Sequence, residues 1–149
     1  MNCHRSPSLG FTLIELLLVV AIIAVASAGV SFAFRDSSQT QLERDAVRLA
    51  ALLESARARS QASGAVVVWR STATGFVFDG LPAGALPQGW LSPEVAAAAP
   101  TLLVLGPEPI TWPQTVQLVW AASAPGAGAL ALDVRTDGVR PYTVQAAVP

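Results

Sequence analysis

The hydrophobic positions of the chain begin with one long apolar run, residues 11–34, in which Glu15 is the only charged residue. As a helix, this run would extend about 36 Å, against a bilayer hydrocarbon core of about 30 Å. It therefore predicts a membrane-spanning helix. On hydropathy alone, an ordinary secretory signal with small residues for cleavage at Ala26-Ser27-Ala28 fits equally well.

A second apolar pattern follows at helical spacing. Its members share one helical face and are Leu42, Ala46, Leu49, Leu53 and Ala56. The pattern predicts an amphipathic helix over 35–63 that covers a core. Thr40 to Glu43 has the spacing of a capping box that would open a separate helix. No Pro or Gly interrupts residues 35–63, so one helix continuous with the apolar run fits equally well.

Five charged residues of this helix are predicted to lie mainly off the apolar stripe, in water: Glu43, Arg44, Arg48, Glu54 and Arg57. Asp45 and Arg48 are three positions apart, as are Glu54 and Arg57, which predicts opposite-charge pairs worth a few tenths of a kcal/mol each. Acidic residues alternate with the arginines. The pattern therefore favours a solvated helix surface over a nucleic-acid interface.

After Gly64, which is predicted to cap the helix, the hydrophobic period changes to that of strands. The predicted strands are residues 65–71, 75–80, 101–105, 115–121, 129–135 and 140–148. Residues 72–74 are predicted to close a hairpin, and Asp137-Gly138 a tight turn. Residues 81–89 and 121–128 are predicted loops, and residues 96–99 a linker or a frayed helical turn. The order of elements predicts an α+β fold, a helix against an antiparallel sheet.

The four tryptophans divide into two pairs. Trp69 and Trp120 lie in apolar strand segments and are predicted core residues. Trp90 and Trp112 lie in Pro-containing loops, where local packing is favoured over a contact with a partner.

Composition excludes several kinds of chemistry. The nine basic residues, all arginines, and ten acidic residues give a net charge of −1, so no broad cationic field attracts nucleic acid. Cys3 and His4, the only Cys and His, precede the apolar run. Without that leader the chain has no disulfide, no common zinc ligands and no Ser-His-Asp triad. We expect no enzymatic activity, no cofactor and no metal.

Glu15 decides between an anchor and a cleaved signal. A carboxylate inside hydrocarbon costs on the order of 2.5–3.5 kcal/mol and usually has a partner. The apolar part of a secretory signal gains nothing from it. Cleavage between Gly10 and Phe11 would instead create an α-amine one turn before Glu15. Pairing of these two charges, within one chain or between neighbouring chains, would offset their desolvation.

The segment Gly10-Phe11-Thr12-Leu13-Ile14-Glu15-Leu16 resembles the processing signal of type IV pilins and type II secretion pseudopilins. The resemblance implies that a prepilin peptidase cuts after Gly10 and methylates the new N-terminal Phe11, while Glu15 helps to set the register between subunits. Leu9 stands where such leaders often carry a basic residue; the nearest cation is Arg5.

Residues 42–70 and the closing DGVRPYTV, residues 137–144, are similar to the H-type minor pseudopilins and their FimT-like relatives. The similarity implies a pilin-like fold with a cleaved leader at 1–10, a transmembrane helix at 11–34, an amphipathic helix at 35–63 and a periplasmic β domain at 64–149. It also implies a single-pass protein of the bacterial inner membrane.

As such a pseudopilin, the chain would join the tip or initiation complex of a periplasmic pseudopilus that drives protein export. Its expected partners are the prepilin peptidase, other minor and major pseudopilins and the inner-membrane assembly platform. The alternative is a FimT-like minor type IV pilin involved in pilus assembly or DNA uptake, with Arg135 and Arg140 as weak DNA contacts across the Asp137-Gly138 turn.

Overall fold

The computed structural model describes residues 12–121 and 130–147, and for residues 27–36 only the backbone of a helix. The chain forms two compact units, residues 1–37 and 38–149. Helix α1, Leu13–Ser63, contributes to both units. The interpretation of a separate helix opening at Thr40 is therefore wrong, because the backbone is helical on both sides of that residue.

No helix within the described residues has the length and hydropathy needed to cross a membrane. The transmembrane helix predicted for 11–34 includes Phe11 and residues 27–34, whose side chains lie outside the described part, so it stays a prediction. Along the described start of α1, large apolar side chains from Leu13 to Val25 are exposed, between 47% and 81%.

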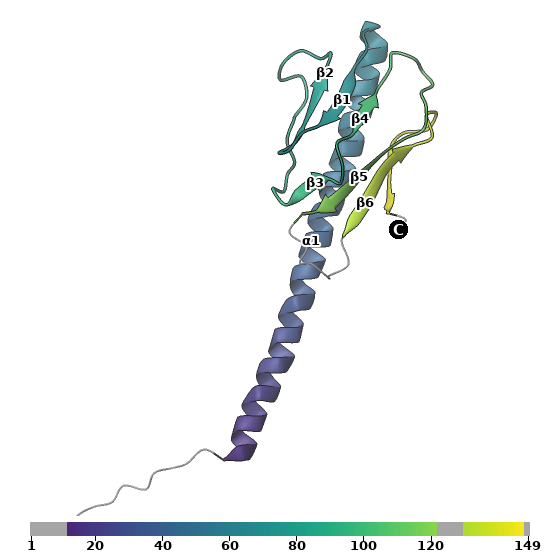
Figure 1. Cartoon of the computed structure of the whole chain (residues 1–149). Coiled ribbons are helices and arrows are strands. Elements are labelled where there is room, and N and C mark those ends of the chain that lie inside the picture. The colour runs from purple at the N-terminus through teal and green to yellow at the C-terminus, as the bar shows by residue number, and fades with distance from the viewer. Residues whose placement is uncertain (1–11, 122–129, 148–149) are drawn as a thin grey trace, which may run out of the picture. The chain divides into compact units, whose positions relative to one another are not determined.

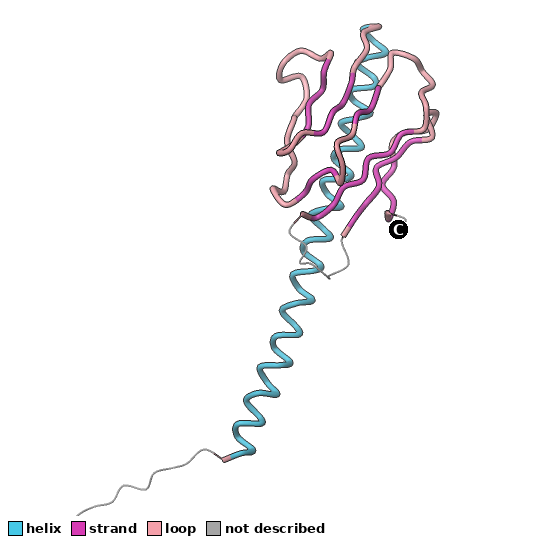
Figure 2. Tube along the Cα trace, in the orientation of Figure 1, coloured by secondary structure: helices cyan, strands magenta, loops and turns pink. Residues whose placement is uncertain are grey.

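The second unit holds all the strands that the structure describes, arranged in two antiparallel sheets (Figures 1 and 2). The strands are β1 Val68–Ser71, β2 Phe76–Asp79, β3 Val95–Ala97, β4 Leu102–Val104, β5 Gln114–Trp120, β6 Ala131–Thr136 and β7 Thr143–Ala146. One sheet has the order β2-β1-β4 and the other β3-β5-β6-β7. The α+β class with antiparallel pairing is confirmed.

Strand pairing agrees with the predicted hairpin and corrects one predicted linker. Ser71 lies opposite Phe76, and the N–H of Thr72 donates to the carbonyl of Gly75 at 2.9 Å, which closes the hairpin. Residues 95–97, which overlap the predicted linker 96–99, form β3 instead, because β5 offers them an antiparallel partner along residues 118–120. Tertiary pairing here overrides the weak strand preference of alanine.

The core lies between α1 and the two sheets. All five residues of the predicted helical stripe are buried, which confirms the predicted amphipathic face. Alternate strand residues supply the other side of the core: Trp69, Phe76, Phe78, Leu103, Val116, Leu118 and Val134. Trp69 is completely buried, as predicted, and its ring centroid lies 5.8 Å from that of Phe76.

The predicted end of the helix is confirmed. Gly64 has a φ of 69°, the left-handed conformation that favours glycine, and its N–H donates to the carbonyl of Ser60 at 2.9 Å. The chain can therefore leave α1 and enter β1 after a short connection.

Candidate assembly site

The start of α1 is fixed by a hydrogen bond that the sequence analysis missed. The N–H of Glu15 donates to Thr12 Oγ1 at 3.3 Å and to the Thr12 carbonyl at 3.1 Å. Thr12 is thus the N-cap residue, and Glu15 is the third residue of the helix. Thr-x-x-Glu is the sequence of a capping box. The same sequence pattern occurs at Thr40, where the helix continues without interruption.

This geometry gives Glu15 a local role in addition to the predicted one in assembly. An acidic side chain in the first helical turn interacts favourably with the positive end of the helix dipole. Glu15 is exposed and therefore accessible to a partner. Gly10 and Phe11, the predicted cleavage and methylation residues, lie outside the described residues, so the predicted pairing between Glu15 and the Phe11 amine stays a prediction.

Asp45 of α1 binds the loop between β2 and β3. Its side chain is only 1% exposed. One carboxylate oxygen accepts from the N–H of Leu91 at 2.7 Å, and the other accepts from the N–H of Ser92 at 3.1 Å. One turn further along, Arg48 Nη1 donates to the carbonyl of Gly89 at 2.7 Å. Helix side chains therefore hold four consecutive loop residues, 89–92, at three points.

Arg57, only 6% exposed, holds two other loops. Its Nη2 donates to the carbonyl of Pro109 at 2.6 Å and to that of Gly138 at 3.1 Å. Its Nε is buried and has no hydrogen-bond partner among the described residues. A buried guanidinium of this kind favours one arrangement of the surrounding carbonyls, because any movement would leave further donors unpaired.

Glu54 completes the polar contacts of this helix face. Its Oε1 accepts from the N–H of Tyr142 at 2.9 Å, just before β7 begins. Burial raises the pKa of the Tyr142 hydroxyl to about 12; the charge of Arg57 opposes the rise and that of Glu54 adds to it.

The predicted ion pairs on this helix are not formed. Neither Asp45 with Arg48 nor Glu54 with Arg57 makes a salt bridge in the described part of the chain, where the ion pairs join Arg70 to Asp79 and Arg140 to Asp137. The physical reason is that loop backbone groups are closer partners for these four side chains. The prediction that Arg57 lies in water is also wrong, since it is buried.

The turn between β6 and β7 packs closely on the loop that precedes β5. The N–H of Thr111 donates to the carbonyl of Gly138 at 3.1 Å. Gly138 has a φ of 92°, and a Cβ at this position would overlap the carbonyl oxygen of Thr111. Only glycine therefore fits the turn. Asp137 Oδ1 accepts from the N–H groups of Val139 and Arg140 at 2.9 and 2.7 Å, and these bonds lower the pKa of its carboxyl group.

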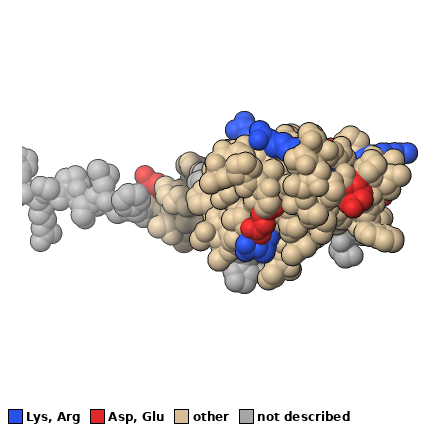
Figure 3. All heavy atoms as spheres, turned by 90° about the horizontal axis from the view of Figure 1, so that it is seen from above, with Lys and Arg blue, Asp and Glu red and all other residues tan. Residues whose placement is uncertain are grey.

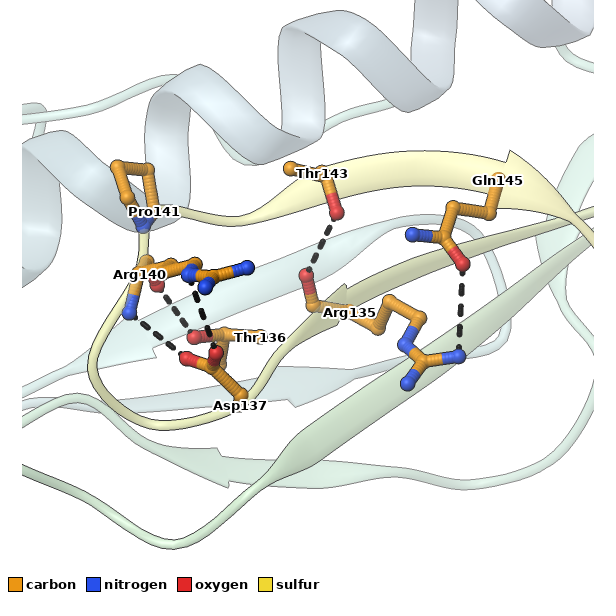
Figure 4. Close-up of a pocket in the computed structure, with 7 residues that line it drawn as sticks. All are labelled: Arg135, Thr136, Asp137, Arg140, Pro141, Thr143 and Gln145. Atoms are coloured by element: carbon orange, nitrogen blue, oxygen red, sulfur yellow. Dashed lines mark hydrogen bonds and ion pairs between the residues drawn. The ribbon is translucent and has the colours of Figure 1, made fainter.

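Arg135 and Arg140, the predicted weak DNA contacts, are brought to the same hollow of about 220 Å³ (Figure 4). Arg135 Nη1 donates to Gln145 Oε1 at 3.4 Å, and Arg140 Nε lies 3.7 Å from Asp137 Oδ2. The first is a long hydrogen bond and the second an ion pair beyond hydrogen-bond distance. The hollow also contains the Asp137 carboxylate, so its cationic character is reduced.

The charged groups do not form a continuous band on the face drawn in Figure 3, where arginines and acids are scattered among uncharged residues. A groove for single-stranded nucleic acid normally follows the backbone with successive cations and stacking side chains. Within the described residues, no group of three or more His, Cys, Asp or Glu side chains could hold a metal ion.

Comparison with known proteins supports the signal at the N-terminus. The family model of the prokaryotic N-terminal methylation motif matches residues 5–31. This motif is that of type IV pilin-like proteins, pseudopilins included, and implies processing by a prepilin peptidase and assembly with other pilin-like subunits. It also suggests a membrane-anchored N-terminus with the following domain outside the cytoplasm. No curated protein and no solved structure matches the chain.

Proposed function

We propose that this chain is a minor pseudopilin of a type II secretion system. It would join the tip or initiation complex of a periplasmic pseudopilus that drives protein export across the outer membrane. The observation that carries the proposal is a methylation motif at residues 5–31 that leads into one helix, Leu13–Ser63, whose later part packs on antiparallel sheets. The similarity of residues 42–70 and 137–144 to H-type minor pseudopilins supports the subfamily.

The proposed mechanism is assembly without catalysis. A prepilin peptidase of the inner membrane cuts between Gly10 and Phe11 and methylates the Phe11 amine. The apolar segment 11–34 anchors the subunit until it passes to neighbouring helices in the filament. The exposed apolar side chains from Leu13 to Val25 are suited to both environments, because lipid tails and apolar helix faces cover them equally. The β domain then contacts other pseudopilins and the assembly platform.

Processing is tested by the intact mass and N-terminal sequence of the mature protein from its native host. A chain that begins with N-methyl-Phe11 supports prepilin processing. A chain that begins at Gly29, after the Ala26-Ser27-Ala28 segment, would mean that the anchor is removed, and the proposal would fail.

The role of Glu15 is tested by two substitutions that separate its charge from its position in the helix. Glu15→Ala removes both the charge and the capping-box residue. Glu15→Gln removes only the charge, because Gln also serves at this position of a capping box. If the charge pairs with the Phe11 amine of a neighbour, both variants insert into the membrane normally and both enter the pseudopilin complex poorly.

Co-purification of the tagged chain with other pilin-like subunits, relative to its amount in the membrane, measures this incorporation. Glu43→Gln is the matched control, because Glu43 is an exposed acid on the same helix that accepts a bond from Gln39 Nε2 at 3.0 Å. Normal incorporation of Glu15→Gln, with a loss only in Glu15→Ala, would assign Glu15 to helix capping instead.

The second candidate function, DNA uptake by a FimT-like minor pilin, is favoured by one observation: Arg135 and Arg140 line the same hollow. A gel shift of the detergent-solubilised full chain with DNA, repeated at increasing salt, tests it. A role in DNA uptake requires that the chain bind DNA at low salt and that this binding weaken as the salt concentration rises. The Arg135→Ala variant should also bind DNA more weakly than the unmodified chain. The absence of binding at low salt removes this candidate.

A further inference from the structure

Three large apolar side chains lie exposed on two adjacent loops of the second unit. They are Ile110 and Trp112, on the loop between β4 and β5, and Val139, in the turn between β6 and β7; their exposed fractions are 67%, 85% and 67%. Figure 1 shows these two loops next to each other. The other tryptophans, Trp69, Trp90 and Trp120, are buried or half-buried. Trp112 alone among the four leaves nearly all of its surface in water.

Hydrogen bonds hold the backbone of the two loops that carry these side chains. Arg57 donates to the carbonyls of Pro109 and Gly138, and Thr111 donates to Gly138 as well. The backbone of Gly138 lies so close to the loop that a Cβ would also come within 3.3 Å of the Trp112 carbonyl carbon. Binding a partner here would therefore order little additional chain, which removes a main cost of association. Rigidly mounted tryptophans are frequent hot spots of protein interfaces.

Two arginines and two acidic residues lie near these apolar side chains. Arg135, Arg140 and Asp137 line one hollow, whereas the exposed Glu108 precedes Ile110 by two residues on the other loop. Arg140 follows Val139 directly, and its side chain is 84% exposed. Arg140 and Arg135 line the hollow of Figure 4 together with one carboxylate, that of Asp137. Asp137 Oδ1 already accepts bonds from two backbone N–H groups. The ion pair between Arg140 Nε and Asp137 Oδ2 is exposed and 3.7 Å long. The Asp137 carboxylate therefore satisfies few of the hydrogen-bond donors of the two guanidinium groups.

We propose that Ile110, Trp112 and Val139 form a docking surface for a neighbouring pilin-like subunit. The complementary surface on that subunit offers an apolar pocket for Trp112, bordered by an Asp or Glu that binds Arg140 and Arg135. Charge complementarity assigns the acidic border, since a guanidinium binds a carboxylate through two parallel hydrogen bonds. That the partner is a pilin-like subunit rests on the proposed function; the surface itself does not.

A photoreactive side chain at position 112 tests the contact directly. The full chain carries Trp112→p-benzoylphenylalanine and is irradiated in membranes of its native host. Leu91→p-benzoylphenylalanine is the matched control, because Leu91 has 58% exposure and lies on another loop that a helix side chain holds. We expect an adduct from position 112, absent from position 91, that peptide mapping places on an apolar segment next to an acidic residue of another pilin-like subunit.

Adducts of equal yield from both positions, or an adduct from position 112 with DNA or with a protein that is not pilin-like, would overturn the proposal.

Substitutions test the energetic role. Trp112→Ala is expected to weaken co-purification with the mapped subunit roughly 30-fold or more, and Leu91→Ala to leave it unchanged. Arg140→Glu is expected to weaken it as well, and reversal of the mapped partner carboxylate to Arg is expected to restore it. Arg140 is exposed, so this variant remains informative if Trp112→Ala lowers the amount of folded chain.

Failure of the docking surface can be distinguished from failure of the proposed function. If the unmodified chain co-purifies with other pilin-like subunits but Trp112→Ala and Arg140→Glu do so equally well, the docking surface is wrong and the proposed function stands. If the unmodified chain co-purifies with no pilin-like subunit, the proposed function and the assigned partner both fail.

Discussion

The buried carboxylate of Asp45 allows one prediction to be worked out in magnitude. In Asp45→Asn, one side-chain oxygen still accepts a bond, as now from Leu91 at 2.7 Å, but an amide donor replaces the oxygen that accepts from Ser92 at 3.1 Å. Hydrogen bonds to charged groups contribute about 1.5–3 kcal/mol each, and a buried donor left without a partner costs about 1–3 kcal/mol. Since these two ranges describe overlapping effects, we expect a loss of roughly 2–4 kcal/mol.

A loss of this size is a large part of a typical domain stability of about 5–15 kcal/mol. For a urea dependence of about 2 kcal/mol per molar, the middle of the typical range of about 1–3, the unfolding midpoint should fall by about 1–2 M. The assay is urea unfolding of the detergent-solubilised full chain, followed by tryptophan fluorescence. Trp90 is a suitable reporter, because it adjoins Leu91 in sequence and its ring centroid lies 4.7 Å from that of Phe76.

Glu43→Gln provides the control for removal of a negative charge from the same helix. Glu43 is exposed, so we expect the free energy of unfolding of the Glu43→Gln variant to differ from that of the unmodified chain by no more than about 0.5 kcal/mol. If Asp45→Asn shifts the midpoint no further than Glu43→Gln, the reasoning that a buried helix carboxylate fixes the loop at residues 91–92 is refuted.

Two further predictions concern the β6–β7 turn and the residues just after it. Gly138→Ala should destabilise the protein by at least about 2 kcal/mol in the same assay, because it adds a steric overlap with Thr111 to the cost of a left-handed backbone. Gly64→Ala is the control, because a Cβ there meets nothing within 4 Å and the variant should show the backbone cost alone. Equal losses of stability in the two variants would contradict the overlap. Tyr142 is the only tyrosine, so ultraviolet absorbance should show one ionisation near pH 12 in the folded chain. Because the folded pKa is raised, this residue's contribution to stability should be complete below about pH 10 and lost as the pH rises toward 12; an ionisation near 10 in the folded chain would refute its burial.

The sequence predicted the parts of the fold that depend on local periodicity. The stripe of Leu42, Ala46, Leu49, Leu53 and Ala56 was identified because its spacing matches a helix whatever lies against it. Gly64 was identified from its position just after the periodic residues. The strand at Val95–Ala97 was missed because two of its three residues are alanines, whose strand preference is weak, and they become a strand only when β5 pairs with them.

The polar contacts of α1 could not be predicted, because their partners are distant in the chain. Asp45 and Arg57 have the composition of a solvated helix face, and only the position of loops 46 and 81 residues away makes them buried ligands. Arg135 and Arg140 were expected to meet across the Asp137-Gly138 turn, and both line the hollow, which the sequence did not predict. The N-cap at Thr12 was predictable from the pattern Thr-x-x-Glu at the start of an apolar run, but Glu15 was interpreted only as a charge within the apolar segment.

The polar contacts between α1 and its loops also constrain the order in which the domain is completed. Arg57 binds the carbonyl of Gly138, 81 residues later in the chain, and Glu54 binds the N–H of Tyr142, 88 residues later. During synthesis the helix emerges first, and these side chains remain hydrated until the last described hairpin arrives. Contacts of such long sequence separation close late, since the intervening chain must lose its freedom first. A nascent chain interrupted before residue 137 would therefore contain the complete helix but could not form the bonds of Arg57 to Gly138 and of Glu54 to Tyr142.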